Sequence, residues 1–383
     1  MWIEQRTWTA ADGWSVTKAV EPRPDGQPSG AALVLYFAAP GTMPAEDLLA
    51  ELRRHHGDAA IVGCTTGGEI SANEVLDDSI VTAAVGFDRA SVRVAARDLA
   101  DTSESRRIGQ ELAHALTGDG LRAIFLLSDG TRVNGDSLVA GCLETVPSEV
   151  IVTGGLAGDG PRFQSTAVGC NDAMRPGRVA AIGFYGDSLS IGHGSFGGWD
   201  EFGPPRTITR AEGNVLFELD GEPALDLYKR YLGEEAQGLP GSALLFPLSI
   251  RPSAGAEGSE VVRTIVGIDE AAKSMTFAGD VPAGYLARLM RGNFDNLVDG
   301  AGKAAEAASG IRPDCLAILV SCIGRKLLMG QRIAEEVEIV ADVLGGTAGL
   351  IGFYSYGEIS PHGFTGKCEL HNQTMTITTI SEH

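Results

Sequence analysis

Two segments of this chain share one short pattern, G-x-x-[TS]-x-G-E-I. The first occupies residues 63–70 and the second residues 352–359. Each is preceded at the same distance by an Ala-Glu-acid triplet, starting at Ala45 and Ala334, because 63 − 45 and 352 − 334 both equal 18. A spacing kept over the length of a helix indicates a repeated structural unit, since a chance octapeptide would not bring its upstream segment along. The pattern therefore predicts an internal duplication.

The residues upstream of each motif indicate what this unit is. Residues 47–54 place leucines on one helical face, and residues 333–344 repeat that spacing with Ile, Val and Leu before a Gly-Gly stop. A short apolar run then leads into each motif. We expect a helix, a strand and a glycine turn in each copy. We also expect the turns to lie at strand ends in related sheets, with Glu69 and Glu358 in equivalent positions.

A third, looser copy lies between these two. Residues 121–127 form an apolar run that ends in Ser-Asp-Gly, residues 136–143 suit a helix, and residues 150–152 lead into the glycine-rich segment 154–160. Apolar strands that alternate with helices of this length are typical of βαβ units and a largely buried sheet. The first part of the chain is therefore predicted to be α/β.

The glycine turns are candidate ligand contacts. In open α/β sheets ligands bind beyond the carboxyl ends of strands, where glycine lets the backbone approach closely. Gly63, Cys64, Gly154 and Gly155 follow such strands. The alternative is that these glycines only form tight turns.

Beyond residue 160 the pattern changes to consecutive strands. Residues 179–185 and 189–193 flank Gly186-Asp187, a pair that signals a hairpin turn. We expect an α/β fold, α+β in part, with two domains built on mixed sheets. Their predicted ranges are 1–205 and 206–383, the second continuing through a helix that ends near Leu232.

Charge and composition exclude several classes of protein. The formal net charge of −20 argues against nucleic-acid binding and against an anionic membrane surface, because both need clustered Lys and Arg. No apolar stretch is long enough to span a bilayer, and no secretory signal pattern opens the sequence. The six cysteines include no C-x-x-C pair and suit reduced thiols. A cytoplasmic protein without membrane insertion is expected.

Several motifs of the chain resemble those of the FIST family (F-box and intracellular signal transduction proteins), whose members join an N-terminal and a C-terminal FIST domain. The resemblance extends over nearly the whole chain and is most specific at residues 352–361 and 369–374. The segments that carry it are 63–70, 128–130, 154–160, 217–221, 322–325, 352–361 and 369–374.

The resemblance implies a sensory module that binds a small ligand and reports to a signalling partner. The stand-alone bacterial layout is similar to the branch that binds haem b, senses nitric oxide and acts on a histidine kinase or on a cyclic-di-GMP enzyme, either a diguanylate cyclase or a phosphodiesterase. The motif at Gly67-Gly68-Glu69 lacks the residues of a cyclase active site. The output is therefore expected in another protein. The sequence leaves the oligomeric state open, a homodimer being one option.

Haem would need an axial ligand, which directs attention to the histidines. His371 lies between the Tyr356 turn and an alternating strand, and His193 has glycines on both sides. We expect His371, or else His193, to be the iron ligand if haem binds. The alternative for each is a structural histidine, and His362 in a polar turn is a weaker candidate. Covalent attachment is excluded because there is no C-x-x-C-H.

Four further side chains belong to the expected ligand site. Arg325 could hold a carboxylate through its bidentate fork, or could instead pair with Glu335 or Glu358. Cys322 precedes it in what should be a strand-end loop, and Tyr356 and Glu358 belong to the second glycine turn.

Two other functions stay open beside a haem-based sensor. One is a sensor of a non-haem ligand such as an amino acid. The other is an enzyme that uses Cys322 or Cys64 as nucleophile with Glu69, Glu358 and His371. An enzyme would need an acid or base of perturbed pKa beside a reactive thiol, whereas a sensor needs only a complementary site and a mobile element.

Overall fold

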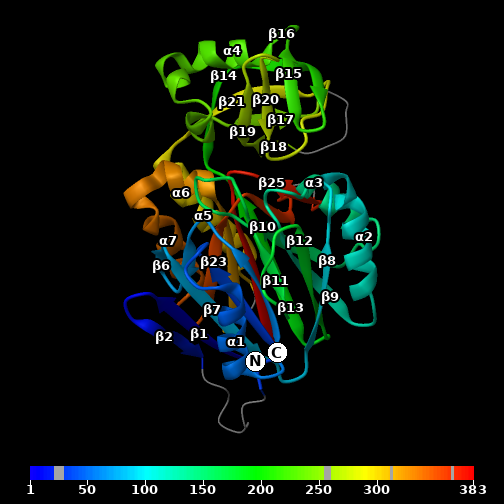
Figure 1. Cartoon of the computed structure of the whole chain (residues 1–383), viewed down its shortest axis with the longest axis vertical. Coiled ribbons are helices and arrows are strands. Elements are labelled where there is room, and N and C mark those ends of the chain that lie inside the picture. The colour runs from blue at the N-terminus through cyan, green and yellow to red at the C-terminus, as the bar shows by residue number, and fades with distance from the viewer. Residues whose placement is uncertain (21–29, 254–259, 311–313, 364–365) are drawn as a thin grey trace.

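The computed structural model describes residues 1–20, 30–253, 260–310, 314–363 and 366–383. It forms two bodies (Figure 1). The larger, lower body contains both termini, and the smaller, upper body is built from β14 (Trp199–Glu212) through β21 (Leu286–Gly292). The chain is thus a mixed α/β protein with two domains, as the sequence predicted. The division predicted after residue 205 falls inside β14, and its position stays a prediction.

Three mixed sheets of six strands each make up the lower body. The strands of the first sheet, in the order β11-β4-β3-β7-β1-β2, are β1 (Trp2–Thr9), β2 (Gly13–Val20), β3 (Leu33–Ala38), β4 (Ala60–Thr65), β7 (Ser79–Gly86) and β11 (Val168–Cys170). Strands β3 and β7 are buried along their whole length. Such continuous apolar runs are typical of strands covered on both faces.

The other two sheets repeat this layout. The second, in the order β25-β24-β10-β9-β12-β8, contains β8 (Ser91–Asp98), β9 (Leu121–Ser128), β10 (Ile151–Leu156), β12 (Arg178–Tyr185), β24 (Gly357–Pro361) and β25 (Cys368–His371). The third, in the order β13-β26-β22-β23-β5-β6, contains β5 (Glu69–Ser71), β6 (Glu74–Leu76), β13 (Leu189–Phe196), β22 (Leu316–Cys322), β23 (Gly349–Ser355) and β26 (Met375–Glu382).

Each sheet is built around the same three strands. A parallel pair, β3–β4, β9–β10 or β22–β23, carries one antiparallel strand, which is β7, β12 or β26 respectively. The strand that follows each pair leaves its own sheet: β5 pairs with β23, β24 with β10, and β11 with β4. Three equivalent units therefore exchange strands in a closed ring. The third, looser copy expected from the sequence is the middle unit of this ring.

The helices occupy matching places in these units. Helices α1 (Ala45–His56), α3 (Gly135–Leu143) and α7 (Ala334–Leu344) each connect the two strands of a parallel pair. Helices α1 and α7 begin at Ala45 and Ala334, which confirms the 18-residue register. Figure 1 shows α2 (Ser105–Leu116) beside α3 on one side of the lower body, with α5 (Phe294–Ala308) and α7 on the other. Leu48 and Leu52 of α1 are buried, as the leucine spacing predicts.

Two local expectations were wrong. The segments at 179–185 and 189–193 do not form a hairpin, because β12 pairs with β8 and β9 whereas β13 pairs with β26. The turn at Gly186 carries the chain from one sheet to another. Residues that follow β22 form the short helix α6 (Ile323–Met329) instead of a strand-end loop. The remaining short helical turns are η1 (Thr102–Glu104), η2 (Gly233–Gly238), η3 (Gly241–Leu245) and η4 (Gly330–Arg332).

The upper body has its own core. Helix α4 (Ala224–Leu232) packs on it through buried Leu225 and Tyr228, and Pro223 precedes the first turn of this helix. The body's strands follow the order β18-β17-β21-β14-β15-β20-β19, with β16 beside β15. Those not yet given are β15 (Val215–Leu219), β16 (Glu222–Pro223), β17 (Leu248–Arg251), β18 (Val261–Arg263), β19 (Ile265–Asp269) and β20 (Ser274–Phe277).

Candidate functional site

The three glycine turns contact one another through backbone hydrogen bonds. In each unit, one residue accepts a hydrogen bond through its carbonyl oxygen. The residue two positions later donates its N–H to the carbonyl oxygen of another unit. The bonds run from Gly67 N to Tyr354 O (2.8 Å), from Tyr356 N to Leu156 O (3.1 Å) and from Gly158 N to Thr65 O (3.0 Å). This ring ties together the carboxyl ends of the three parallel strand pairs.

The first glycine of each turn is required by strand packing. A Cβ at Gly63 would lie 2.0 Å from the carbonyl oxygen of Tyr36, and one at Gly154 would lie 2.1 Å from that of Leu126. Real Cβ atoms do not approach oxygen so closely, so a side chain would push adjacent strands apart. Gly155 is similarly confined, since its Cβ would lie 2.5 Å from Val320 Cγ1. These predicted site residues contact neighbouring strands.

Glu69 and Glu358 occupy equivalent positions, as the repeated motif predicts. Glu69 accepts hydrogen bonds from the Thr66 hydroxyl and from Ser79, whose hydroxyl lies at 2.7 Å and whose N–H lies at 3.2 Å. Glu358 accepts from the Ser355 hydroxyl at 2.6 Å and from the Thr374 hydroxyl and N–H at 2.9 and 3.2 Å. By the register of the ring, the middle unit has Gly160 at this place.

Burial dominates the electrostatics of both carboxyls. It raises the pKa of Glu69 to about 7 and that of Glu358 to about 8, against the opposing effect of the hydrogen bonds. Both side chains are fully buried. They therefore act within the protein, as anchors that hold the turns to Ser79 at the start of β7 and to Thr374 just before β26.

Cys64 and Cys322 are buried at strand ends. Burial raises the pKa of both thiols well above the ordinary value, and the nearby carboxyls of Glu69 and Glu358 raise them further. A thiol needs to form the thiolate to act as a nucleophile. The environment of these cysteines disfavours the reactive form that an enzyme of this kind would use.

Arg325 is fully buried and pairs with Glu336, whereas the sequence had suggested Glu335 or Glu358 as the alternative to a ligand carboxylate. Its Nε donates to Glu336 Oε2 at 2.9 Å. Its Nη1 and Nη2 donate to the carbonyl oxygens of Gly197 and Leu297 at 2.9 and 2.8 Å. The guanidinium thus joins α6, α7, the start of α5 and the segment after β13 in the interior of the protein.

His371 lies on β25, opposite Glu358 in the β24–β25 ladder. Its Nε2 lies 2.9 Å from the carbonyl oxygen of Ser360, so this nitrogen carries the proton and donates it. Burial lowers the pKa of His371 to about 4. The ring of His362 lies beside it, with 5.9 Å between the ring centroids. At neutral pH His371 is a neutral, hydrogen-bonded histidine.

His193 lies in a different environment on β13. It is half-buried and lines a cavity of about 470 Å³ together with Ile191, Phe196, Pro361 and Ile151. Burial lowers the pKa of the imidazole. Among the residues that the structure describes, none forms a hydrogen bond with this imidazole. The hydroxyl of Ser195, which lines the same cavity, is buried without a partner among those residues.

A second cavity, of about 440 Å³, lies between the two bodies, and we call it the cleft cavity. Its lower wall comes from residues 130–135 at the start of α3, from Leu156 and from the aromatic side chains of Phe163 and Tyr356. Its upper wall contains Asn214, Val266, Thr276, Phe277, Ala278 and Gly279. It therefore lies beyond the carboxyl ends of β9 and β10, where a ligand is expected in this class of fold.

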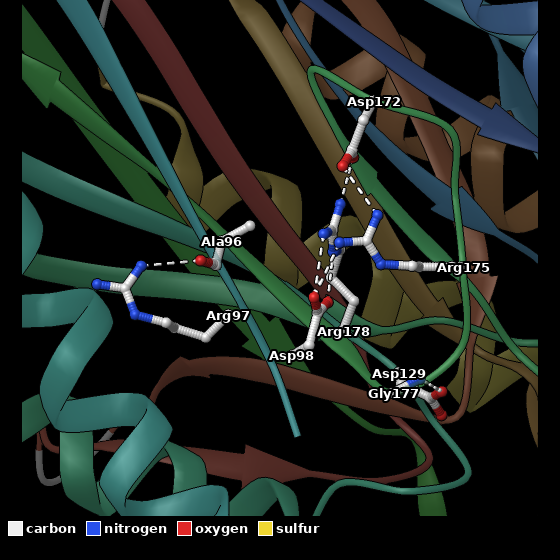
Figure 2. A network of polar contacts seen from close by, with 8 residues as sticks. All are labelled: Ala96, Arg97, Asp98, Asp129, Asp172, Arg175, Gly177 and Arg178. Carbon is white, nitrogen blue, oxygen red and sulfur yellow. Dashed lines mark hydrogen bonds and ion pairs between the residues drawn. The ribbon is translucent and has the colours of Figure 1, made fainter. Parts of the chain in front are cut away.

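Asp129 anchors the loop that forms the lower wall. This fully buried carboxylate accepts hydrogen bonds from the N–H groups of Thr131 (2.7 Å) and Arg132 (3.0 Å). Its other oxygen accepts from Gly177 N at 2.7 Å (Figure 2). The next residue, Arg178, is buried and pairs with Asp98 and Asp172, so the base of the loop is fixed to β12 and β8.

The segment before β26 joins the lower body to the upper one. Gln373 donates from Nε2 to the Leu244 carbonyl oxygen (3.1 Å) and to the Thr264 hydroxyl (2.9 Å), both in the upper body. Asn372 accepts from Thr264 N, and the guanidinium of Arg263 donates to the Leu370 carbonyl oxygen at 2.9 Å. The Leu-His-Asn-Gln sequence is therefore a contact between the bodies beside the cleft cavity.

Of the predicted site residues, only Tyr356 lines the cleft cavity, and only His193 lines the cavity of about 470 Å³. Sequence reasoning missed Arg132, Asn134, Phe163 and the residues of the upper body. The Asp-Gly step after β9 could have indicated the loop, because a strand end followed by a helix start is a common ligand position. No local signal marks Phe163.

Comparison with known proteins defines the class. The family model of the FIST N domain matches residues 32–222, and that of the FIST C domain matches residues 224–361. The chain belongs to the FIST family, which identifies it as a signal-transduction sensor of small ligands. In the part of the chain that the structure describes, no helix is long and apolar enough to cross a membrane.

Individual proteins show more distant likeness. Two uncharacterized proteins of Mycobacterium tuberculosis, from strains CDC 1551 / Oshkosh and H37Rv, are each 23% identical over 360 residues, covering 89% of this chain and 91% of their own length. A crystal structure of the cyanuric acid hydrolase from A. caulinodans aligns over 92% of this chain and 90% of its own, with 10% identity and a TM-score of 0.36. A likeness of this size carries no functional argument.

Proposed function

We propose that this protein is a cytoplasmic sensor that binds a small ligand in the cleft cavity and reports its presence to a separate signalling enzyme. The observation that carries the proposal is the position of this cavity, which is walled by both bodies. Its lower wall includes Tyr356 and the anchored loop 130–135, and its upper wall includes Val266 and Phe277. Ligand pockets occur preferentially at such domain interfaces.

A ligand held there can act by differential affinity. If it contacts both walls, it stabilises the arrangement of the two bodies in which both contacts are made. The contacts of Gln373 and Asn372 with the upper body are the ones that a relative movement would alter. The partner would be a histidine kinase, a diguanylate cyclase or a phosphodiesterase that distinguishes the two arrangements.

Blocking the cavity tests this proposal. Val266 lines the cavity and is 36% exposed, so Val266→Arg should fill the cleft without disturbing a core. Val16→Arg, at a 56% exposed valine of β2, is the matched control. A screen of cytoplasmic metabolites by thermal shift should find compounds that stabilise the wild type and the control. At a concentration 100 times the Kd, the stabilisation should be about 2.7 kcal/mol.

The same variants test signalling. Autophosphorylation of candidate kinases, or turnover of cyclic-di-GMP, should respond to the ligand with the wild type and with Val16→Arg, and should not respond with Val266→Arg. A partner whose activity is the same with and without saturating ligand would contradict the sensor function.

A haem-based nitric oxide sensor is the second candidate, and the cavity at His193 favours it. The half-buried imidazole of His193 has no hydrogen-bond partner in the described residues and lies among Ile191, Phe196 and Pro361. An imidazole beside an apolar space suits an axial ligand of haem b. Among the described residues that line this cavity there is no Lys or Arg to pair with the haem propionates. The bound iron would supply the coordination of nitric oxide.

His371 is the other axial candidate, but it would first have to give up its bond to Ser360. Absorption spectra of protein mixed with haem separate the two. His193→Ala should abolish the Soret band of bound haem, whereas His371→Ala should leave it in place. If both variants bind haem with an unchanged spectrum, neither histidine is the ligand, and if the wild type takes up none, the non-haem sensor stands alone.

A further inference from the structure

The walls of the cleft cavity also indicate which chemical class of ligand fits it. This inference rests on the proposed sensor function and deepens it. Three properties of the walls bear on the question: their aromatic surface, their charge and the conformation of Phe163.

Aromatic rings form part of the lower wall. The rings of Phe163 and Tyr356 are stacked, with 4.2 Å between centroids and 12° between planes, and both line the cavity. Phe277 and Leu156 add apolar surface from the two bodies. A flat ring is the ligand group that such a surface accommodates best, because stacked aromatic rings gain more than their buried area alone provides.

The backbone of Phe163 is held in an unfavourable conformation. Its φ is +51°, in the left-handed region that bulky residues rarely adopt. The conformation is kept by neighbours: Phe163 N donates to the Tyr356 hydroxyl at 3.1 Å, and Asp159 accepts from the N–H groups of Gln164 and Ser165, both at 3.0 Å. Strain of this kind collects at ligand sites, where the surrounding structure fixes it. Here it holds a phenyl ring on the cavity wall.

The charge of the walls is unusual for this chain. Although the protein has 50 acidic and 30 basic residues, no Asp or Glu is among the described residues that line the cleft cavity. Arg132 lines it, and no carboxylate of the described residues pairs with this arginine. The neighbouring cavity at Arg263 differs, since it is lined by Asp136, Asp280 and Glu369.

The start of α3 suits an anion as well. Asn134 caps α3 by accepting from Ser137 N at 2.8 Å, and Gly135, the first residue of that helix, lines the cavity. The positive end of the helix dipole therefore lies on the same wall as Arg132. Thr276, which carries a hydroxyl, also lines the cavity, whereas Thr131 donates its hydroxyl to Asp129 and Asn214 donates from Nδ2 to the Phe277 carbonyl oxygen.

We propose that the cleft cavity takes a planar aromatic or heteroaromatic ligand with one anionic group, its ring on the Phe163–Tyr356 stack and its anion at Arg132. Calorimetric titration with matched probes tests this class. Benzoate, indole-3-carboxylate and 2-naphthoate are compared with their neutral carboxamides and with cyclohexanecarboxylate. At least one aromatic carboxylate should bind, about tenfold or more tightly than its carboxamide, because hydrogen bonds to charged groups are the stronger ones.

Two variants assign the groups. Arg132→Gln should remove the preference for the carboxylate, whereas Arg122→Gln, at an exposed arginine of β9, should keep it. Phe163→Gly removes the ring but allows the left-handed backbone, so it should weaken carboxylate and carboxamide alike by about tenfold. Because the strain is relieved, its thermal midpoint should not fall far. This variant therefore separates loss of the ring from loss of the fold.

The outcomes distinguish this inference from the sensor function itself. Unchanged affinities in both Arg132→Gln and Phe163→Gly, or equal binding of cyclohexanecarboxylate, overturn the ligand class. The ligand class is also overturned if the only compounds that stabilise the wild type, but not Val266→Arg, are non-aromatic or cationic. The sensor function stands in that case. If no compound stabilises the wild type more than Val266→Arg, both fail.

Discussion

Replacement of Arg325 by methionine should lower the free energy of unfolding by several kcal/mol, because it removes a buried ion pair and two buried hydrogen bonds. The guanidinium is 0% exposed, pairs with the equally buried Glu336 and satisfies two carbonyl groups, those of Gly197 and Leu297. Arg325→Met leaves a buried carboxylate without its cation and two buried acceptors without donors. Removing one partner of a buried pair costs about 3–5 kcal/mol, and each of the two orphaned acceptors about 1–3 kcal/mol more, so we expect a loss of at least about 5 kcal/mol.

Urea unfolding followed by circular dichroism measures this loss. Arg332→Met is the matched control, since the Arg332 side chain is 43% exposed and pairs with Asp295 and Glu335 at the surface. Exposed pairs of this kind contribute about 0–1 kcal/mol. The double variant Arg325→Met/Glu336→Gln should regain part of the stability, because glutamine carries no charge that needs a partner.

The role of Arg325 decides between two interpretations of the sequence. If the free energy of unfolding of Arg325→Met lies less than about 1 kcal/mol below that of the wild type, the buried pair with Glu336 does not stabilise the interior. A folded variant with unchanged stability but lost ligand affinity would instead make Arg325 a ligand residue.

Three further predictions concern the turns and the contact between the bodies. The free energy of unfolding should fall as pH rises from 4.5 towards 8, because the folded protein keeps Glu358 protonated while the unfolded chain ionises it; Glu358→Gln should flatten this slope in urea unfolding at several pH values. Gly154→Ala should cost about 2–4 kcal/mol of stability, since the backbone has a φ of +148° and the new Cβ would lie 2.1 Å from the Leu126 carbonyl oxygen. The control Gly241→Ala, with open space around it, should cost little, and equal urea midpoints of the two variants would contradict the packing argument. Gln373→Ala should speed amide hydrogen exchange at 244–246 and 263–265 in the upper body, because both bonds from Nε2 are lost, and unaltered exchange would show that this side chain does not couple the bodies.

The repeated motif predicted much of the fold. The spacing of 18 residues between helix start and glycine turn recurs in the first and third units, and α1 and α7 begin at the residues that it predicts. Apolar runs indicated individual strands as well, since the runs at 121–127 and 150–152 correspond to the buried strands β9 and β10. The strand exchange could not be predicted, because the pairing of β5 with β23 depends on contacts between residues far apart in the sequence, such as Ile70 with Gly352, and not on local pattern.

The candidate site was less predictable than the fold. The turns of the Gly-Glu-Ile motifs were predicted to be ligand contacts. Glu69 and Glu358 are instead buried and form hydrogen bonds with Ser79 and Thr374 inside the protein. A motif shows that a residue is needed, but burial decides whether it meets a ligand. Phe163 lies in a segment without regular secondary structure, and Val266 and Phe277 belong to the inserted upper body, so only the folded chain brings them to Tyr356.

The central claim is that a ligand binds between the loop at 130–135 and the upper body. Hydrogen exchange followed by mass spectrometry tests it most directly, on the wild type with and without the compound that stabilises it most. Exchange should slow in two separate segments, 130–137 at the start of α3 and 274–279 around the end of β20, because the ligand contacts both walls. Slowed exchange confined to 189–196, beside His193, with both cleft segments unchanged, would contradict the claim and place the ligand in the other cavity.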